Sequence, residues 1–185
     1  MGINLPRKLF HISCGFSLFI LSLFLNYTYF KTFLIFLFLG FSIFEFLRLY
    51  SNKFFPSLLK WILKKLLKDE EEKRFNDGWY FIAGLIFSSF ILEKYYFQLI
   101  LLILTFSDPI ASFIGIFFGK HKIKDKTLEG SLGFFISTFI INYFWTKFLF
   151  FSLWLSLILS ITELFIKKDN FWIPFIGSIY LKIFK

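Results

Sequence analysis

Residues 107–130 read SDPIASFIGIFFGKHKIKDKTLEG, and they join an apolar segment to a loop rich in lysine. The carboxylate of Asp108 lies deep inside the apolar segment, and Pro109 follows it directly. A charged side chain at the centre of a membrane costs roughly 3 kcal/mol or more, so it is retained mainly where it functions or is paired. We therefore expect the chemistry of this chain to lie at Asp108 and in the loop that follows it.

The sequence at Asp108-Pro109 has two readings. Proline suits the first turn of a helix and disfavours helical dihedral angles in the residue before it, so Asp108 could cap a new half-helix. Alternatively, one helix continues through Pro109 with a kink. In both readings the backbone hydrogen-bond ladder is interrupted at membrane depth, which is tolerated where the site is buried in protein or wet. Such breaks recur at ion and substrate sites of membrane proteins.

Composition places the whole chain in the membrane class. It has 185 residues, of which 57% are hydrophobic and 25% aromatic, and its mean hydropathy is +0.71. A soluble domain of this length carries fewer apolar and more charged residues. The net charge of +9 would suit a nucleic-acid ligand, but the basic residues lie between apolar segments, which indicates membrane topology and no nucleic-acid partner. The single cysteine, Cys14, excludes an internal disulfide and a thiolate metal site.

Six segments are apolar enough to be membrane spans, at about 20 residues for each crossing. They are residues 9–25, 33–47, 79–92, 96–118, 132–145 and 148–166. A last apolar segment, 171–184, contains Pro174 and Gly177, and we expect it to be interfacial or half-inserted. The predicted fold is therefore all-α: one polytopic, membrane-embedded helical bundle that forms a single domain over residues 1–185.

Lysine and arginine fall mainly on one side of these spans. Eighteen of the 21 basic residues lie in the N-terminus, in the loops 48–74, 120–126 and 167–168, and in the C-terminal tail. The other side has only Lys31, Lys94 and Lys147. Because loops rich in lysine and arginine stay in the cytoplasm, we expect a multi-pass inner-membrane protein with both termini and the 119–131 loop cytoplasmic.

The first cytoplasmic loop, 51–77, contains an amphipathic segment at residues 57–68. Its leucine and isoleucine residues share one helical face, and Lys60, Lys64 and Lys68 form a stripe on the other. Such a helix lies in the membrane interface and is favoured by anionic lipid, either as an anchor to the surface or as a gate for lipid entry. The loop ends in the sequence Asn76-Asp77-Gly78, which supplies a candidate N-cap for the helix of the next span.

The loop 119–131 combines the groups that a nucleotide site needs. Four lysines fall within residues 120–126, and the loop also carries the carboxylates Asp125 and Glu129. A site for a nucleoside triphosphate needs cations for the phosphates, carboxylates for Mg²⁺, and glycines that let backbone N–H groups approach oxygen atoms. Upstream, small residues on the helical face of Asp108 permit close approach by a helix, a ligand or a second protomer. They are Ala111, Ser112, Gly115 and Gly119.

Other ionisable residues lie near the cytoplasmic ends of the predicted spans. Glu45 and Arg48 are three residues apart, so an ion pair within one helix is the simpler reading. Glu163 precedes Lys167 by four residues, which allows another such pair. His11 lies at the same membrane level as these groups, and a shared polar cavity would explain them together.

Two stretches resemble one family. Residues 108–123 follow Asp-Pro-Ile-Ala-Ser-x-x-Gly-x-x-x-Gly-Lys-His-Lys-Ile, and residues 126–133 follow Lys-Thr-Leu-Glu-Gly-Ser-Leu-Gly. Both resemble the central motif of the CTP-dependent polyprenol kinases, a family that includes dolichol kinase, phytol and farnesol kinases and a fungal-type diacylglycerol kinase. Flanking pieces match in the same order. They are Arg7-Lys8-x-x-His11-x-x-x-Gly15, Glu45-x-x-Arg48, Glu163, and Asp169-Asn170-x-x-x-Pro174.

The resemblance implies transfer of the γ-phosphoryl group of CTP to the hydroxyl of a membrane isoprenoid alcohol, with Mg²⁺ as cofactor. It implies that Asp108 holds Mg²⁺, with Glu129 or Asp169 as the second carboxylate, and that the alcohol's base is Asp108, Glu163 or His11. The residues implied to bind the nucleotide are Gly115, Gly119, Lys120, His121, Lys122, Lys126, Thr127, Gly130, Asn76 and Asn170.

Two other functions remain open at this point. Phosphatidate cytidylyltransferases, which make CDP-lipid from CTP, have a similar central motif, but they usually carry Ser-Pro-Lys-Lys-Thr where this chain has Lys124-Asp125-Lys126-Thr127. The N-terminal and C-terminal pieces favour the kinase. A non-enzymatic lipid-binding or transport protein is the third alternative. Many transporters are built from internal repeats, and none is evident here.

Overall fold

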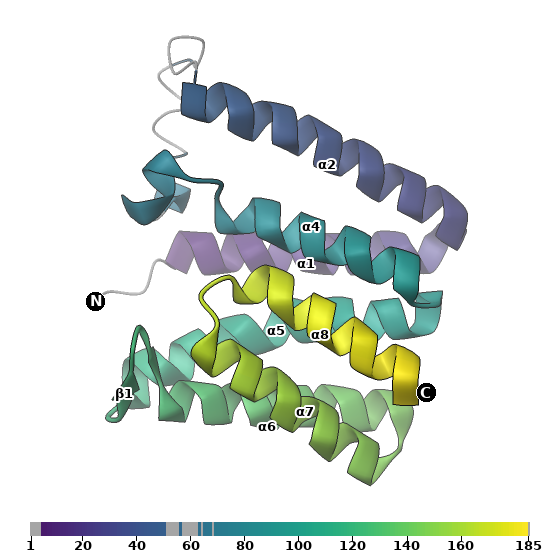
Figure 1. Cartoon of the computed structure of the whole chain (residues 1–185), viewed down its shortest axis with the longest axis vertical. Helices are drawn as coiled ribbons and strands as arrows, with labels where there is room; N and C mark the ends of the chain where they lie inside the picture. The colour runs from purple at the N-terminus through teal and green to yellow at the C-terminus, as the bar shows by residue number, and fades with distance from the viewer. Residues whose placement is uncertain (1–4, 51–55, 57–62, 64, 68, 185) are drawn as a thin grey trace.

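Seven α-helices form a bundle in the part of the chain that the structure describes (Figure 1). This computed structural model describes residues 5–50, 56, 63, 65–67 and 69–184. The helices are α1 (Leu5–Phe24), α2 (Tyr27–Tyr50), α4 (Asp77–Ile91), α5 (Lys94–Phe118), α6 (Leu128–Thr146), α7 (Leu149–Phe165) and α8 (Asp169–Phe184). A 3-10 helix, η2 (Asp69–Lys73), precedes α4, and the strands β1 (Lys122–Ile123) and β2 (Lys126–Thr127) form a hairpin between α5 and α6. The all-α prediction is confirmed.

Helix α5 is at the centre of the bundle. It contacts α1, α6 and α8, and most of its residues before Asp108 are buried, including Leu99, Ile100 and Ile103. The helix is continuous through Pro109, so Asp108 does not cap a new half-helix. Burial on several faces explains why the helix before Asp108 is mostly apolar.

Much of the outer surface of the bundle is apolar. Large side chains such as Phe36, Phe144 and Phe150 are between 67% and 76% exposed. Among the described residues, the helices α1, α2 and α5 are long and apolar enough to cross a membrane. A continuous apolar exterior of this kind is unusual for a soluble monomer and typical of a surface that faces lipid. The structure therefore supports a membrane protein.

The segment 171–184 differs from its prediction. As part of α8 it lies along α4 and also contacts α5 and α7 (Figure 1). The residues that suggested an interrupted segment are its contact points: a Cβ added to Gly84 of α4 would lie 2.5 Å from Cγ of Pro174, and one added to Gly177 would lie 2.6 Å from Cδ1 of Ile100. The segment is one continuous helix, so Pro174 and Gly177 do not interrupt it, because close helix packing outweighs the local preferences of proline and glycine.

The course of α8 also places the two chain ends at opposite ends of the bundle (Figure 1). The hairpin, the start of α4 and the start of α8 lie at the same end of the bundle as the start of α1, whereas the α1–α2 and α6–α7 turns lie at the other end. If every helix crosses a membrane, this arrangement would put the two ends on opposite sides, whereas the sequence predicts one side for both termini. The predicted amphipathic helix at 57–68 falls mostly outside the described residues; within it, Leu63, Lys65 and Leu66 are described and are helical.

Candidate functional site

The first ion pair of the site joins α1 to the middle of α5. Nζ of Lys8 lies 2.7 Å from Oδ2 of Asp108, and both side chains are largely buried. One turn along α1, Nε2 of His11 lies 3.1 Å from the carbonyl oxygen of Leu104, and its ring packs edge-on against Phe81. The Lys-x-x-His pattern of α1 thus positions two polar groups along the stretch of α5 that contains Asp108.

Gly15 is the third α1 residue of this pattern, and its role is close packing. A Cβ at this position would lie 2.2 Å from Oγ1 of Thr105 in α5, which is closer than any real contact. The glycine lets the two helices approach, so that Lys8 and His11 reach α5. A packing function accounts for Gly15 without any direct part in chemistry.

The second ion group surrounds Lys126, which leaves the hairpin toward the bundle. Its Nζ lies 2.8 Å from Oε1 of Glu163 and 2.6 Å from Oδ2 of Asp169, and it also donates to the carbonyl oxygen of Glu163. Burial alone would lower the pKa of the Lys126 ammonium, but the two adjacent carboxylates outweigh it and hold the pKa above its ordinary value. Lys126 is therefore a fixed cation between the end of α7 and the start of α8.

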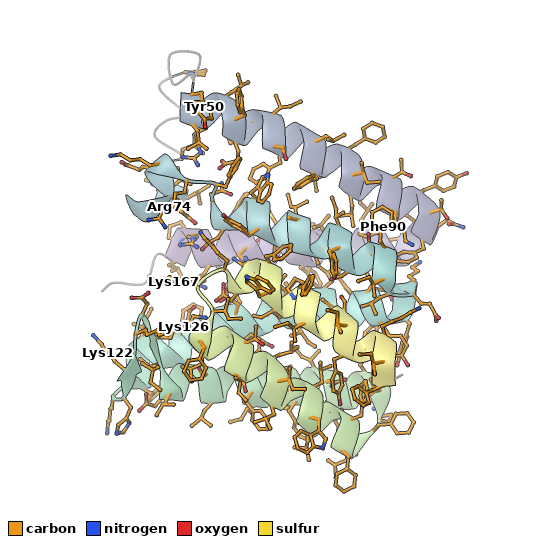
Figure 2. The ribbon with its side chains drawn as sticks, in the orientation of Figure 1. Tyr50, Arg74, Phe90, Lys122, Lys126 and Lys167 are labelled. Carbon is orange, nitrogen blue, oxygen red and sulfur yellow. The ribbon has the colours of Figure 1, made fainter. Side chains whose placement is uncertain are left out.

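These two ion groups are neighbours. Asp108 is close enough to Lys126 and Asp169 to interact electrostatically with both. Beside them, Arg7 pairs with Asp77, and Nζ of Lys168 lies 3.8 Å from the other oxygen of Asp77. Together they form what we term the charge cluster: Arg7, Lys8, Asp77, Asp108, Lys126, Glu163, Lys168 and Asp169. Figure 2 shows Lys126 at the same end of the bundle as Arg74 and Lys167, with Phe90 at the opposite end.

Glu163 connects the charge cluster to α6. Its second oxygen, Oε2, accepts a hydrogen bond from the Ser131 hydroxyl at 2.6 Å, and the residue is only 5% exposed. The predicted pair of Glu163 with Lys167 is wrong, since Glu163 binds Lys126 and Lys167 lies 3.0 Å from Asp125 of the hairpin. The helix ends at Phe165, so the four-residue spacing does not hold the two side chains on one face.

Thr127 and the glycines that were predicted to bind the nucleotide lie where α5 packs closely against the hairpin and α6. Thr127 is the N-cap of α6, where its Oγ1 accepts from the N–H of Gly130 at 3.1 Å. A Cβ on Gly115 would lie 2.8 Å from that same oxygen, and one on Gly130 would lie 2.9 Å from the carbonyl oxygen of Ala111. The chain's own hairpin and α6 therefore cover the small-residue face of α5, which was one candidate surface for a second protomer. Gly119 ends α5 beside Thr127.

Glu129 and three of the four loop lysines are directed away from the charge cluster. Oε1 of Glu129 lies 2.7 Å from Nδ1 of His121, and the carboxylate also accepts from the His121 backbone N–H. Hydrogen bonds from the His121 ring and from nearby backbone N–H groups lower the pKa of Glu129 to about 2. Three lysines of the loop are exposed: Lys120, Lys122 and Lys124.

Glu45, Arg48 and Asn76 hold the loop before α4. The ion pair of Glu45 and Arg48 is confirmed, with two contacts of 2.8 and 2.7 Å, and Arg48 also donates to the carbonyl oxygens of Glu71 and Arg74. Asn76 is confirmed as the N-cap of α4, and its Nδ2 donates to Glu45 at 3.1 Å. Both ends of the Asn76 side chain are thus engaged within the fold.

The side chain of Asn170, unlike that of Asn76, has an unpaired oxygen: its Oδ1 is buried without a hydrogen-bond partner in the described part of the chain. The residue is 6% exposed and follows Asp169, which accepts from the Asn170 backbone N–H at 2.8 Å. An unpaired buried acceptor costs about 1–3 kcal/mol, so its retention beside the charge cluster is consistent with a polar ligand.

The carboxylates of the charge cluster suit one mode of Mg²⁺ binding. Mg²⁺ is commonly held by one or two carboxylates together with substrate phosphates and water. Asp108 and Asp169, which both interact with Lys126, match this donor set. Glu129 does not join them, and no three His, Cys, Asp or Glu residues of the described chain form a group that could hold a metal by themselves.

Sequence reasoning missed several members of the site. Asp77 was considered only as part of a capping sequence, Lys168 only as a topology signal, and Ser131 only as a letter in a motif. The clue for Asp77 was its position at the start of an apolar helix. The proximity of these residues depends on tertiary packing, which no local pattern encodes.

Comparison with known protein families, with curated proteins and with solved structures gave no match for this chain.

Proposed function

We propose that this protein is a membrane-embedded kinase that transfers the γ-phosphoryl group of CTP to an isoprenoid alcohol. The observation that carries the proposal is the charge cluster. Five separate segments contribute to it, and its central residues are those of the motifs that resemble polyprenol kinases. We further propose that all seven helices cross the membrane, with the charge cluster on the cytoplasmic side.

The arrangement of charges supports phosphoryl transfer. This reaction depends mostly on positioning and on stabilisation of phosphate charge. Lys126 is held in place by two carboxylates before any nucleotide binds, so it needs little reorganisation to contact a phosphate. The exposed lysines of the hairpin would attract the triphosphate from solution.

The charge balance of the site supports Mg²⁺ as the cofactor of phosphoryl transfer. The charge cluster contains as many carboxylates as cations, and Glu71 lies 3.8 Å from Arg7 as a further carboxylate. A triphosphate would therefore add unbalanced negative charge. Asp108 and Asp169 would hold Mg²⁺, which would neutralise phosphate oxygens and orient the nucleotide. The CTP preference rests on the family resemblance.

The distribution of basic residues supports the proposed orientation. Figure 2 places the basic residues Arg74, Lys122, Lys126 and Lys167 at the end of the bundle that carries the charge cluster, which favours the cytoplasmic side for that end. Some helices are short for a bilayer: the 15 residues of α4 extend about 22 Å, against a hydrocarbon core of about 30 Å. A locally thin membrane around the bundle would accommodate them.

The proposal is tested with the full chain purified in detergent, Mg²⁺ and γ-labelled CTP, with geranylgeraniol, a longer polyprenol, diacylglycerol and phosphatidate offered separately. Label in the phosphate of an isoprenoid alcohol supports the kinase. Release of labelled pyrophosphate that requires phosphatidate would replace it with a cytidylyltransferase. No turnover with any acceptor would favour lipid binding or transport.

A pair of variants examines Lys126 in the same assay. Lys126→Met should raise the KM for CTP about tenfold or more, because a fixed phosphate contact is lost. Lys122→Met is the matched control, since it removes an equal charge from an exposed position of the same hairpin. Equal effects of the two variants would contradict a specific phosphate contact for Lys126.

A further inference from the structure

An apolar groove lies between α6 and α7, on the outside of the bundle. Its volume is about 260 Å³. The lining residues are Leu128, Ser131, Leu132, Phe135, Leu157, Ser160, Ile161 and Leu164. Leu132 and Ile161 are 58% and 50% exposed, so the groove is open to the surroundings of the bundle along its rim. In a membrane it would be open to lipid.

The groove reaches the charge cluster through one side chain. Ser131 lines it and donates its hydroxyl hydrogen to Oε2 of Glu163 at 2.6 Å, while Oε1 of Glu163 binds Lys126 at 2.8 Å. A carboxylate oxygen accepts more than one hydrogen bond. An alcohol at the cluster end of the groove could therefore donate to Glu163 beside Ser131.

We infer that this groove holds the hydrocarbon chain of the acceptor, with its terminal hydroxyl at Ser131 and Glu163; the inference rests on the proposed kinase function. The occupant is a single isoprenoid chain. The groove is smaller than the roughly 300–1,000 Å³ typical of pockets that enclose a drug-sized ligand, so it has room for a segment of one chain and not for two acyl tails.

The location assigns a proton acceptor. The alcohol oxygen forms a bond to the γ-phosphorus of CTP, the bond from that phosphorus to the β–γ bridging oxygen breaks, and CDP leaves. The hydroxyl proton passes to Glu163. Among the three candidates for the general base, this location therefore selects Glu163 over Asp108 and His11. Lys126 binds the other oxygen of Glu163, Oε1, so a phosphate held by Lys126 would lie on that side of the carboxylate.

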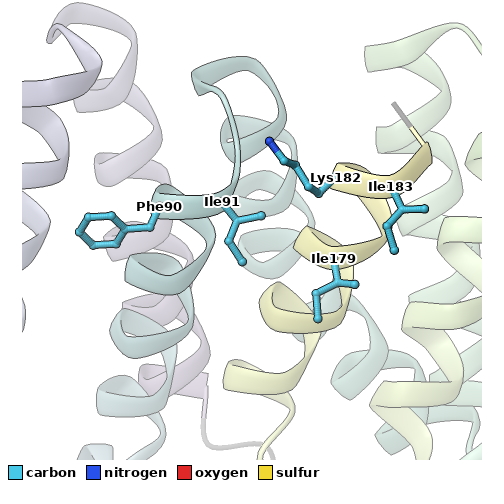
Figure 3. Close-up of a pocket in the computed structure, with 5 residues that line it drawn as sticks. All are labelled: Phe90, Ile91, Ile179, Lys182 and Ile183. Atoms are coloured by element: carbon cyan, nitrogen blue, oxygen red, sulfur yellow. The ribbon is translucent and has the colours of Figure 1, made fainter.

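A second groove, at the opposite end of the bundle, lacks this connection. It lies between α4 and α8 and has a volume of about 360 Å³ (Figure 3). Its lining residues are Phe90, Ile91, Ile179, Lys182 and Ile183, which include no carboxylate to accept a proton. It lies at the C-terminal ends of α4 and α8, which separates it from the charge cluster at the opposite end of the bundle (Figures 2 and 3).

Photocrosslinking tests the location directly. The full chain is reconstituted in phosphatidylcholine vesicles with geranylgeraniol that carries a diazirine in its chain, irradiated, digested and analysed by mass spectrometry. We expect adducts on α6 and α7 around Leu132 and Ile161, reduced by excess unlabelled geranylgeraniol. Adducts spread over the outer faces of α1 and α2, or insensitive to the competitor, would overturn the inference.

Tryptophan substitutions provide the functional test. Leu132→Trp and Ile161→Trp should fill the groove from its rim and lower kcat/KM for geranylgeraniol about tenfold. Ile140→Trp is the matched control, because this α6 residue is 47% exposed and lies outside the groove.

The outcomes separate the groove from the enzyme activity. Specific adducts in the groove without turnover of any alcohol would support a site that binds the hydrocarbon chain and would contradict the proposed kinase activity. Turnover with adducts elsewhere, or equal losses in Ile140→Trp and the two groove variants, would keep the kinase and remove the groove as its acceptor site.

Discussion

Asp108 and Lys8 form a pair whose two parts can be tested separately. Asp108→Asn should abolish phosphoryl transfer and also destabilise the fold by about 3 kcal/mol, because it leaves Lys8 as an unpaired, largely buried charge. The double variant Asp108→Asn with Lys8→Met removes that charge and should recover thermal stability. Activity should stay absent from the double variant. A double variant that turns over CTP would show that Asp108 is needed for folding alone.

Glu129 gives a prediction on pH. Its pKa is lowered from 4.5 to about 2 by its bonds to His121, so the interaction stabilises the hairpin fully above pH 4.5 and is lost as the pH falls toward 2. The measurement is hydrogen exchange at the His121 amide, corrected for the intrinsic exchange rate at each pH. Protection should fall across this range in the natural chain. In Glu129→Gln it should be low and independent of pH; the same pH profile in both proteins would contradict the prediction.

At single positions, residues whose roles depend on neighbours in the chain were predictable. Asn76 and the pair of Glu45 and Arg48 follow from capping and helical spacing. The separation of Lys126 from the other lysines of the loop was not predictable, because all four have the same local context. The register of the hairpin, with Ile123 opposite Lys126, determines which lysine faces the bundle.

At the level of helices, the crossing of α4 and α8 gives a paired test. Gly84→Ala places a Cβ 3.0 Å from the carbonyl oxygen of Asn170 and 2.5 Å from Pro174, where little can move. It should destabilise the protein by about 1–3 kcal/mol in thermal unfolding in detergent. The control is Gly40→Ala in α2, where a Cβ would have no neighbour within 4 Å, and it should be neutral or stabilising by up to about 1 kcal/mol. Equal effects would contradict the packing of α8 on α4.

Periodicity and apolar length identified most of the helices and located their ends within about four residues, except for α2, which begins at Tyr27 and was expected to begin at residue 33. They failed for α8, where Pro174 and Gly177 suggested an interrupted segment although both are used for packing. They also could not decide between a broken and a continuous α5. Contacts of α5 with α1 and α6 support the continuous helix, and the local sequence around Pro109 does not encode them.

On the scale of the whole molecule, the course of α8 has a consequence for topology. If the bundle crosses the membrane, the hairpin and the end of α8 lie on opposite sides. In a Cys14→Ser background, Lys124→Cys should react with an impermeant maleimide only after cells are opened. Phe184→Cys should react in intact cells, because Phe184 is 62% exposed at the other end of the bundle. If neither cysteine reacts in intact cells, the C-terminus lies on the cytoplasmic side and the topology proposed here is wrong.

The function proposed for the assembled bundle combines a cytoplasmic charge cluster with a groove that is open to lipid. The most direct test follows the phosphorus atoms of CTP in the full-length protein, with Mg²⁺ and geranylgeraniol in detergent. Parallel reactions use CTP labelled in the γ-phosphate and CTP labelled in the α-phosphate. We expect the γ-label to enter the lipid phase as geranylgeranyl monophosphate, while the α-label stays in the aqueous phase as CDP. Transfer of the α-label to lipid, or retention of both labels in unreacted CTP, would contradict a CTP-dependent kinase.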